Sequence, residues 1–172
     1  MLSAAKLRWE SSDFYRHGRM GQKQDGVDIW GHDEERHIGI QCKNTVGGIS
    51  LGVIQAELES AEAFAPKLDR LYIATTAKRD AALQKAVREL SDQRHRGGKF
   101  RVNILFWDDV FQDLAKDDDV FFKHYPQFGG GVDLVKVHDR KLFKELTKLL
   151  TSDAGPELDY DHPEYRPVRV TG

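Results

Sequence analysis

The sequence predicts an α/β protein with one mixed β-sheet, built from a hairpin followed by parallel crossovers and flanked by helices. Residues 26–30 and 37–43 each alternate apolar and polar side chains, which is the period of a strand, and a polar turn at 32–36 separates them. From residue 51 onward the periodicity changes from helix to strand, then to helix and to strand again. Strands joined by helices are normally parallel neighbours, so the hairpin should continue into a parallel sheet.

The elements follow in order from local signals. In the second strand of the hairpin, Ile38, Ile40 and Cys42 share one face, which places Gly39, Gln41 and Lys43 on the other. A helix over 51–65 is expected, with Ser50 as its cap and Pro66 as its end. The remaining expected elements are a strand at 71–75, a helix at 80–93, a strand at 100–107, and helices at 108–115, 118–124 and 140–150.

Length and composition fit one domain followed by a tail. The chain has 172 residues, of which 40% are hydrophobic, enough for a single core. We expect this domain to span residues 1–151. Residues 152–172 contain Pro156, Pro163 and Pro167 without a sustained period, so a tail or a linker toward a further module is expected there.

Composition also excludes several classes of protein. The mean hydropathy is −0.58, and no run approaches the roughly 18 apolar residues of a membrane span. The first residues lack the apolar stretch of a secretory signal, so we expect a cytoplasmic protein that does not contact a membrane. Cys42 is the single cysteine, which excludes an internal disulfide and a multi-cysteine zinc site. By strand alternation Cys42 should be a buried core thiol and not a nucleophile.

Three polar residues on the hairpin could act together in phosphodiester cleavage. Asp28 lies on the first strand, and Gln41 and Lys43 lie two apart on the second. A carboxylate and an amide oxygen are hard ligands suited to Mg²⁺, which Mn²⁺ can replace. A neighbouring lysine can position or deprotonate the attacking water, or hold the phosphate. We therefore expect Asp28, Gln41 and Lys43 to be catalytic, with Asp28 and Gln41 as metal ligands.

Two segments resemble a known nuclease family. They are GRMGQKQDGVDI at residues 18–29 and IGIQCK at residues 38–43. Together they are similar to the PD-(D/E)xK nuclease superfamily, and more narrowly to its Mrr-like branch, in which a glutamine takes the place of the usual acid before the lysine. The resemblance extends to about residue 128. It implies a restriction-endonuclease-like core and a metal-dependent deoxyribonuclease that cuts double-stranded DNA.

The same resemblance implies a biological setting. Similar domains serve as the effector module of bacterial antiphage or restriction systems, where a sensor or NTPase module often follows. Cutting both strands usually requires two sites, so a homo-oligomer is expected if both strands are cut. The alternative is a catalytically silent nucleic-acid-binding or assembly module with a nuclease fold, because a fold does not secure an activity.

Five further residues could contact metal or DNA, or could have an ordinary structural or surface role. In this family an N-terminal helix often contributes a glutamate near the metal, and Glu10 is the N-terminal glutamate available here; a solvated carboxylate is the alternative. Glu57, on the helix after the motif, has the same two readings. Gln24 either contacts DNA or braces its own loop. Lys78 and Arg79 follow the third strand, where they would face the DNA backbone or form a solvated helix start.

The charge distribution is the reason for proposing a DNA contact at Lys78 and Arg79. The net charge is −2, so the whole chain does not indicate a nucleic-acid binder. Residues 65–101, however, contain ten basic and four acidic residues, a local excess of six positive charges. The histidines show no short ligand spacing, so we expect surface residues and not a metal centre at His32, His37, His95, His124 and His138.

Overall fold

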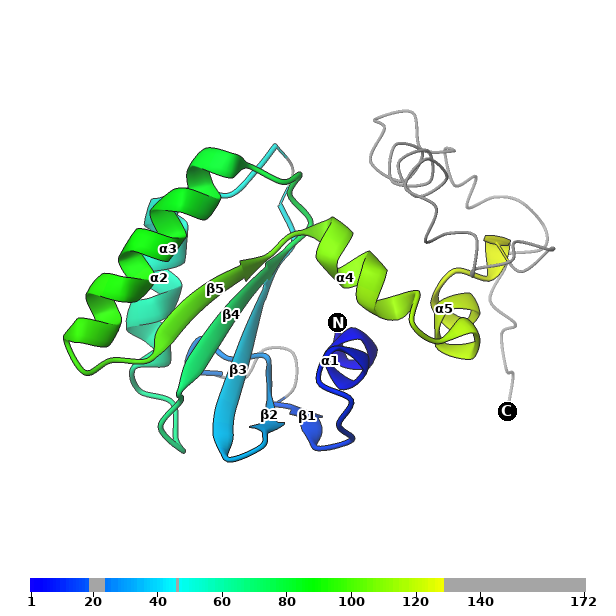
Figure 1. Cartoon of the computed structure of the whole chain (residues 1–172), viewed down its shortest axis with the longest axis horizontal. Helices are drawn as coiled ribbons and strands as arrows, with labels where there is room; N and C mark the ends of the chain where they lie inside the picture. Colours follow the sequence, from blue (N-terminus) through cyan, green and yellow to red (C-terminus); the bar gives the residue numbers. More distant parts are fainter. Residues whose placement is uncertain (19–23, 46, 129–172) are drawn as a thin grey trace, which may run out of the picture. The chain divides into compact units, whose positions relative to one another are not determined.

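A five-stranded mixed sheet organises the described part of the chain, which in this computed structural model is residues 1–18, 24–45 and 47–128 (Figure 1). The strands lie side by side in chain order, with the first three antiparallel and the last three parallel. They are β1 (Phe14–Arg16), β2 (Ile29–Asp33), β3 (Arg36–Lys43), β4 (Arg70–Thr75) and β5 (Arg101–Leu105). The predicted α/β class, with a hairpin and parallel crossovers, is confirmed.

Helices cover both faces of this sheet. Figure 1 shows α2 and α3 on one face and α1 and α4 on the other. The helices are α1 (Leu2–Arg8), α2 (Leu51–Ala61), α3 (Ala81–Arg96), α4 (Trp107–Leu114) and α5 (Asp118–His124), followed by a short 3-10 helix η1 (Pro126–Phe128). Of the helices in the described ranges, none combines the length and apolarity needed to cross a bilayer. The helix expected at 140–150 and the tail at 152–172 lie outside the described residues.

The hairpin turn is tighter than the sequence pattern indicates. The turn was expected at 32–36, but β2 continues to Asp33 and β3 begins at Arg36, leaving a two-residue turn. Glu34 takes up the left-handed conformation that such a turn requires, with φ of 55°. An ion pair of 3.0 Å between Arg36 and Asp33 links the two strand ends across the turn. These two polar residues therefore belong to the strands and not to the turn.

Helix and strand ends differ by a few residues from the prediction. Ser50 caps α2 as expected, because its hydroxyl accepts a hydrogen bond of 3.3 Å from the Val53 amide, yet α2 ends at Ala61 and not at residue 65. Asp80 caps α3 through the Leu83 amide at 3.0 Å, and α3 continues to Arg96. The three-residue strand β1 was not predicted, since it is too short to show a period.

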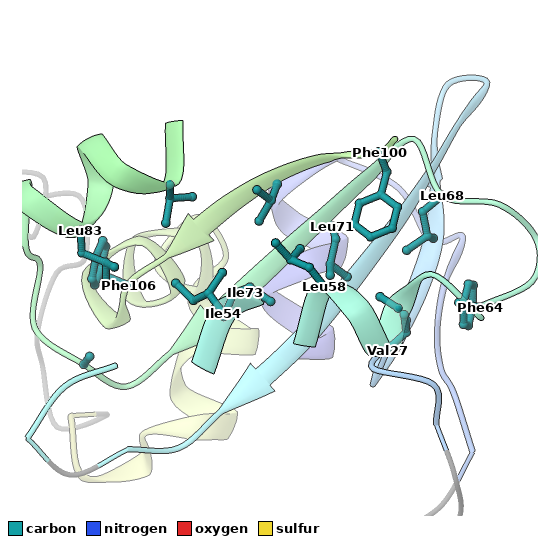
Figure 2. Packing of buried hydrophobic residues seen from close by; sticks show 14 residues of the cluster. Val27, Ile54, Leu58, Phe64, Leu68, Leu71, Ile73, Leu83, Phe100 and Phe106 are labelled. Atoms are coloured by element: carbon teal, nitrogen blue, oxygen red, sulfur yellow. The ribbon is translucent and has the colours of Figure 1, made fainter. Parts of the chain in front are cut away.

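The main core lies between the sheet and the helices α2 and α3. Figure 2 shows the side chains of this cluster, which come from both layers. The helices contribute residues such as Ile54 and Leu58, while Leu71, Ile73 and Val102 come from β4 and β5. The register pairs Gly39 with Leu71 and Gln41 with Ile73, so the face of β3 that carries Gly39, Gln41 and Lys43 faces α2. The predicted alternation of β3 is confirmed.

Alternation fails at the start of β2. The pattern predicts Val27 and Ile29 on one face, but Val27 packs in the cluster beneath α2, where Trp30 also packs, and Ile29 is buried outside that cluster. The reason is a turn at Gly26, with φ of 67°, which delivers Val27 to α2 before the strand begins. Asp28 therefore lies immediately before β2 and not within it.

Gly31 of β2 leaves no room for a side chain against β1 and the residue before it, and its substitution tests this packing. A Cβ at Gly31 would press on the Asp13 carbonyl oxygen and lie 2.6 Å from Phe14 Cδ1. We expect Gly31→Ala to lower the free energy of unfolding by about 1–3 kcal/mol, measured by urea denaturation. Gly52→Ala is the matched control: its Cβ meets no atom closer than 3.9 Å, and alanine favours helix, so it should stabilise by up to about 1 kcal/mol. Equal effects of both substitutions would contradict this packing.

Candidate active site

Asp28 is fixed to the backbone of β3. Its amide donates to the Ile40 carbonyl at 2.9 Å, and its carbonyl accepts from the His17 amide at 2.8 Å. The next hydrogen bond between this segment and β3 uses the Asp28 side chain in place of a backbone carbonyl. Its Oδ2 accepts a hydrogen bond of 2.7 Å from the Cys42 amide. The carboxylate is thereby held beside the one residue that separates Gln41 from Lys43.

Gln41 presents a buried oxygen without a partner. Its Oε1 is shielded from solvent and accepts no hydrogen bond from the described residues. An unsatisfied buried acceptor costs about 1–3 kcal/mol, so native proteins rarely retain one without a use for it. This oxygen is on the strand beside Asp28, on the same strand face as Lys43.

Lys43 is held by an acid from α2. Its Nζ lies 2.6 Å from Glu57 Oε1, and the side chains of Lys43 and Glu57 are 28% and 18% exposed. The turn before Asp28 fixes the position of α2, because a Cβ at Gly26 would lie 2.9 Å from both the Glu57 carbonyl oxygen and the Ala61 amide nitrogen. Only glycine permits this close approach, so one contact links the loop of Asp28 to the helix of Glu57.

Hydrogen bonds of threonine hydroxyl groups link the carboxyl ends of β3 and β4. Lys43 is paired in register with Thr75, the last residue of β4. Beyond the strands, Thr76 Oγ1 accepts from the Thr45 amide at 2.9 Å and donates to Asn44 Oδ1 at 3.0 Å, and the Thr45 and Thr75 hydroxyls lie 3.3 Å apart. These bonds hold the strand end that carries Lys43.

A hollow of about 130 Å³ opens at the same strand ends. Cys42, Lys43 and Thr75 contribute to it from the sheet, and Trp107 and Val110 contribute from α4. Burial, assisted by the negative charge of Asp28, raises the pKa of the Cys42 thiol to about 11. At neutral pH this thiol is protonated, as expected for a residue that is not a nucleophile, although Cys42 is half-buried and not fully within the core.

The residues at this site fit a hard divalent cation. Asp28 offers a carboxylate, and Gln41 offers an orphaned buried oxygen on the adjacent strand. Mg²⁺ normally takes one or two protein ligands of this kind and keeps several waters. In the described ranges no group of three or more His, Cys, Asp and Glu side chains is arranged around a metal position, so water or substrate would complete the coordination.

Glu10 is not brought to this site. It follows α1 in a left-handed turn with φ of 50°, whereas Met1, at the other end of the same helix, lines the hollow. Seven helical residues span about 10 Å, which separates Glu10 from the strand ends. Glu57 is the acid that the structure places beside Lys43, and sequence spacing alone could not show this.

The three residues expected to contact DNA differ in their surroundings. Gln24 braces its loop, since Nε2 donates to the His17 carbonyl at 2.7 Å. Lys78 is exposed and forms no ion pair within the described ranges. Arg79 is engaged by Asp109 at 2.6 Å and Asp108 at 3.3 Å, and the hydrogen bond to Asp109 raises the pKa of its guanidinium.

Much of the basic excess in residues 65–101 is neutralised within the fold. Acids outside that segment supply part of the compensation: Glu62 pairs with Arg94 at 2.8 Å and with Lys99 at 3.1 Å. Within the segment, Arg101 pairs with Asp92 at 2.9 Å. The local charge count therefore overstates the free positive charge available for phosphate.

Comparison with models of known protein families, with curated protein sequences and with solved structures gives no match.

The orphaned oxygen of Gln41 leads to a stability prediction. Gln41→Met keeps the length of the side chain and removes the unsatisfied acceptor, so the free energy of unfolding should rise by about 1 kcal/mol. Urea denaturation of the metal-free protein measures this difference. A fall of the same size would mean that the amide of Gln41 stabilises the fold, and would contradict the assignment of its oxygen as an unsatisfied acceptor.

Proposed function

We propose that this chain is a Mg²⁺-dependent endonuclease domain that hydrolyses phosphodiester bonds in double-stranded DNA, with a restriction-endonuclease-like core. Its place in an antiphage or restriction system is part of the same proposal and rests on the sequence resemblance. The observation that carries the proposal is the buried, partnerless Oε1 of Gln41, on the strand to which the carboxylate of Asp28 is anchored and two residues from Lys43.

The arrangement supports this chemistry because each group has a distinct task. Asp28 and Gln41 would hold the cation through two oxygens, one of them charged. When bound, Mg²⁺ lowers the pKa of a coordinated water and stabilises charge that develops on the phosphate. Lys43 would place an ammonium against a phosphate oxygen, where charge increases in the transition state.

Glu57 would act on the reaction through Lys43. An ion pair of 2.6 Å between two largely buried side chains fixes the direction of a long flexible chain. Without this partner, Lys43 would explore several rotamers and lose part of its effect on the phosphate. Glu57 is therefore proposed as a positioning residue, and Lys43 as the group that contacts substrate.

Lys78 extends the proposed substrate path. It follows β4, and it carries a positive charge without a counter-ion among the described residues. Arg79 beside it is already engaged by two carboxylates, so its contact with DNA would require it to leave them. We assign the phosphate contact on this segment to Lys78 first.

The test is cleavage of supercoiled plasmid and of RNA by the purified chain, each in Mg²⁺ and in EDTA. We expect nicking of DNA in Mg²⁺ alone. Asp28→Asn should lower the rate by about 10²–10³-fold, and Lys43→Met by about 10²–10⁴-fold. Gln41→Met should also lose cleavage while the fold persists.

Stability controls keep this test interpretable. Lys43→Met leaves Glu57 as a half-buried charge without a partner, so its melting temperature should fall. The double variant Lys43→Met with Glu57→Gln removes both charges and should recover stability while remaining inactive. Glu57→Gln alone should retain partial activity. DNA binding without cleavage in the wild-type chain would support the silent module, and wild-type cleavage by Lys43→Met would remove the proposed site.

A further inference from the structure

Two histidines face each other at the end of the sheet opposite to the candidate active site. His32 on β2 and His37 on β3 are directly paired across the hairpin, and their ring centroids lie 4.8 Å apart. Their side chains are 33% and 34% exposed, so an ion could reach them from solvent. The proposed nuclease chemistry uses neither residue.

The backbone brings the two rings close together. The His32 amide donates away from β3, to the Asp13 carbonyl at 3.1 Å. The His37 amide donates to Asp69 Oδ2 at 2.8 Å, and the His37 carbonyl accepts from the Asp69 amide at 2.9 Å, both on the side of β4. The backbone groups of the two histidines therefore do not hydrogen-bond to each other. They form a non-hydrogen-bonded pair of the antiparallel ladder, in which Cα atoms approach to about 4.5 Å.

An aspartate lies on the outer side of each ring. Asp13 Oδ2 is 2.6 Å from His32 Nδ1, and Asp69 Oδ2 is 3.8 Å from His37 Nδ1. The contact at His32 is within hydrogen-bond distance, and a carboxylate at Nδ1 favours the tautomer in which Nε2 carries the lone pair and is the better ligand; the longer contact at His37 places a negative charge near the ring. The four residues form a row across the sheet in the order Asp13, His32, His37, Asp69.

We propose that His32 and His37 bind one divalent transition-metal ion of the class that prefers imidazole, such as Zn²⁺ or Ni²⁺, through their Nε2 atoms. Imidazole nitrogen suits these ions and not Mg²⁺, and the two aspartates would balance the positive charge. Because no third His, Cys, Asp or Glu ligand is arranged with them in the described part of the chain, water or another molecule completes the coordination.

This site is separate from the proposed Mg²⁺ site. Lys43 lies six positions after His37 on β3, which corresponds to about 20 Å along a strand. The two sites also differ in ligand chemistry, with nitrogen at one end of β3 and oxygen at the other. A metal at the histidines would cross-link β2 to β3 beside the tight turn and stabilise the folded state by mass action.

The test uses the full chain without a purification tag. Titration calorimetry with Zn²⁺, and separately with Ni²⁺, should show one saturable site. His32→Ala and His37→Ala should each weaken binding by at least tenfold, whereas the exposed His95→Ala is a matched control and should not change it. Asp13→Asn should weaken binding by about 10–100-fold, as loss of an outer carboxylate does at other histidine sites.

Two further measurements complete the test. The ring proton signals of His32 and His37 in NMR spectra should shift together during the Zn²⁺ titration, and the melting temperature of the wild-type chain should rise while that of His32→Ala does not. Absence of saturable binding would overturn the proposal. It would equally be overturned if only one of the two histidines affected binding, or if shifts appeared first at other histidines.

Discussion

The hydrogen bond between the Cys42 amide and Asp28 Oδ2, 2.7 Å long, fixes where the candidate site lies. A side-chain oxygen here takes a position that a backbone carbonyl would otherwise occupy in the ladder between β2 and β3. The carboxylate is thus placed by strand pairing and not by a flexible side chain alone. Because Gln41 and Lys43 flank Cys42 on the same strand, this bond places the carboxylate beside the segment that carries both of them.

The rest of the fold supports that strand end from both sides. Parallel pairing with β4 and the hydroxyl bonds beyond it hold Lys43 and Thr75 in register. On the helical side, the close approach at Gly26 places α2 so that Glu57 reaches Lys43. The unsatisfied oxygen of Gln41 at this strand end is a local cost to stability, and the proposed function gives that oxygen a ligand.

Periodicity predicted the hairpin, the parallel crossovers and the faces of β3, because these depend on alternation within a strand and on the succession of strands and helices along the chain. It failed at Val27, where the turn at Gly26 overrides alternation, and at β1, which is too short to show a pattern. The contacts of Glu57 with Lys43 and of His32 with His37 depend on helix placement and hairpin register. The first arises from tertiary packing, and the second from a two-residue turn where the pattern indicated a longer one, so residue spacing alone showed neither.

The most direct measurement is the position of a bound cation, read from the broadening of backbone amide signals by substoichiometric Mn²⁺ in NMR spectra. Mn²⁺ occupies oxygen sites similar to those of Mg²⁺, and its unpaired electrons broaden the signals of nearby protons. We expect the amides of Gln41 and Cys42 to broaden first, and this effect to be lost in Asp28→Asn. Sharp signals at both residues, with broadening centred instead on the acidic start of α5 at Asp118 and Asp119, would contradict the proposed site.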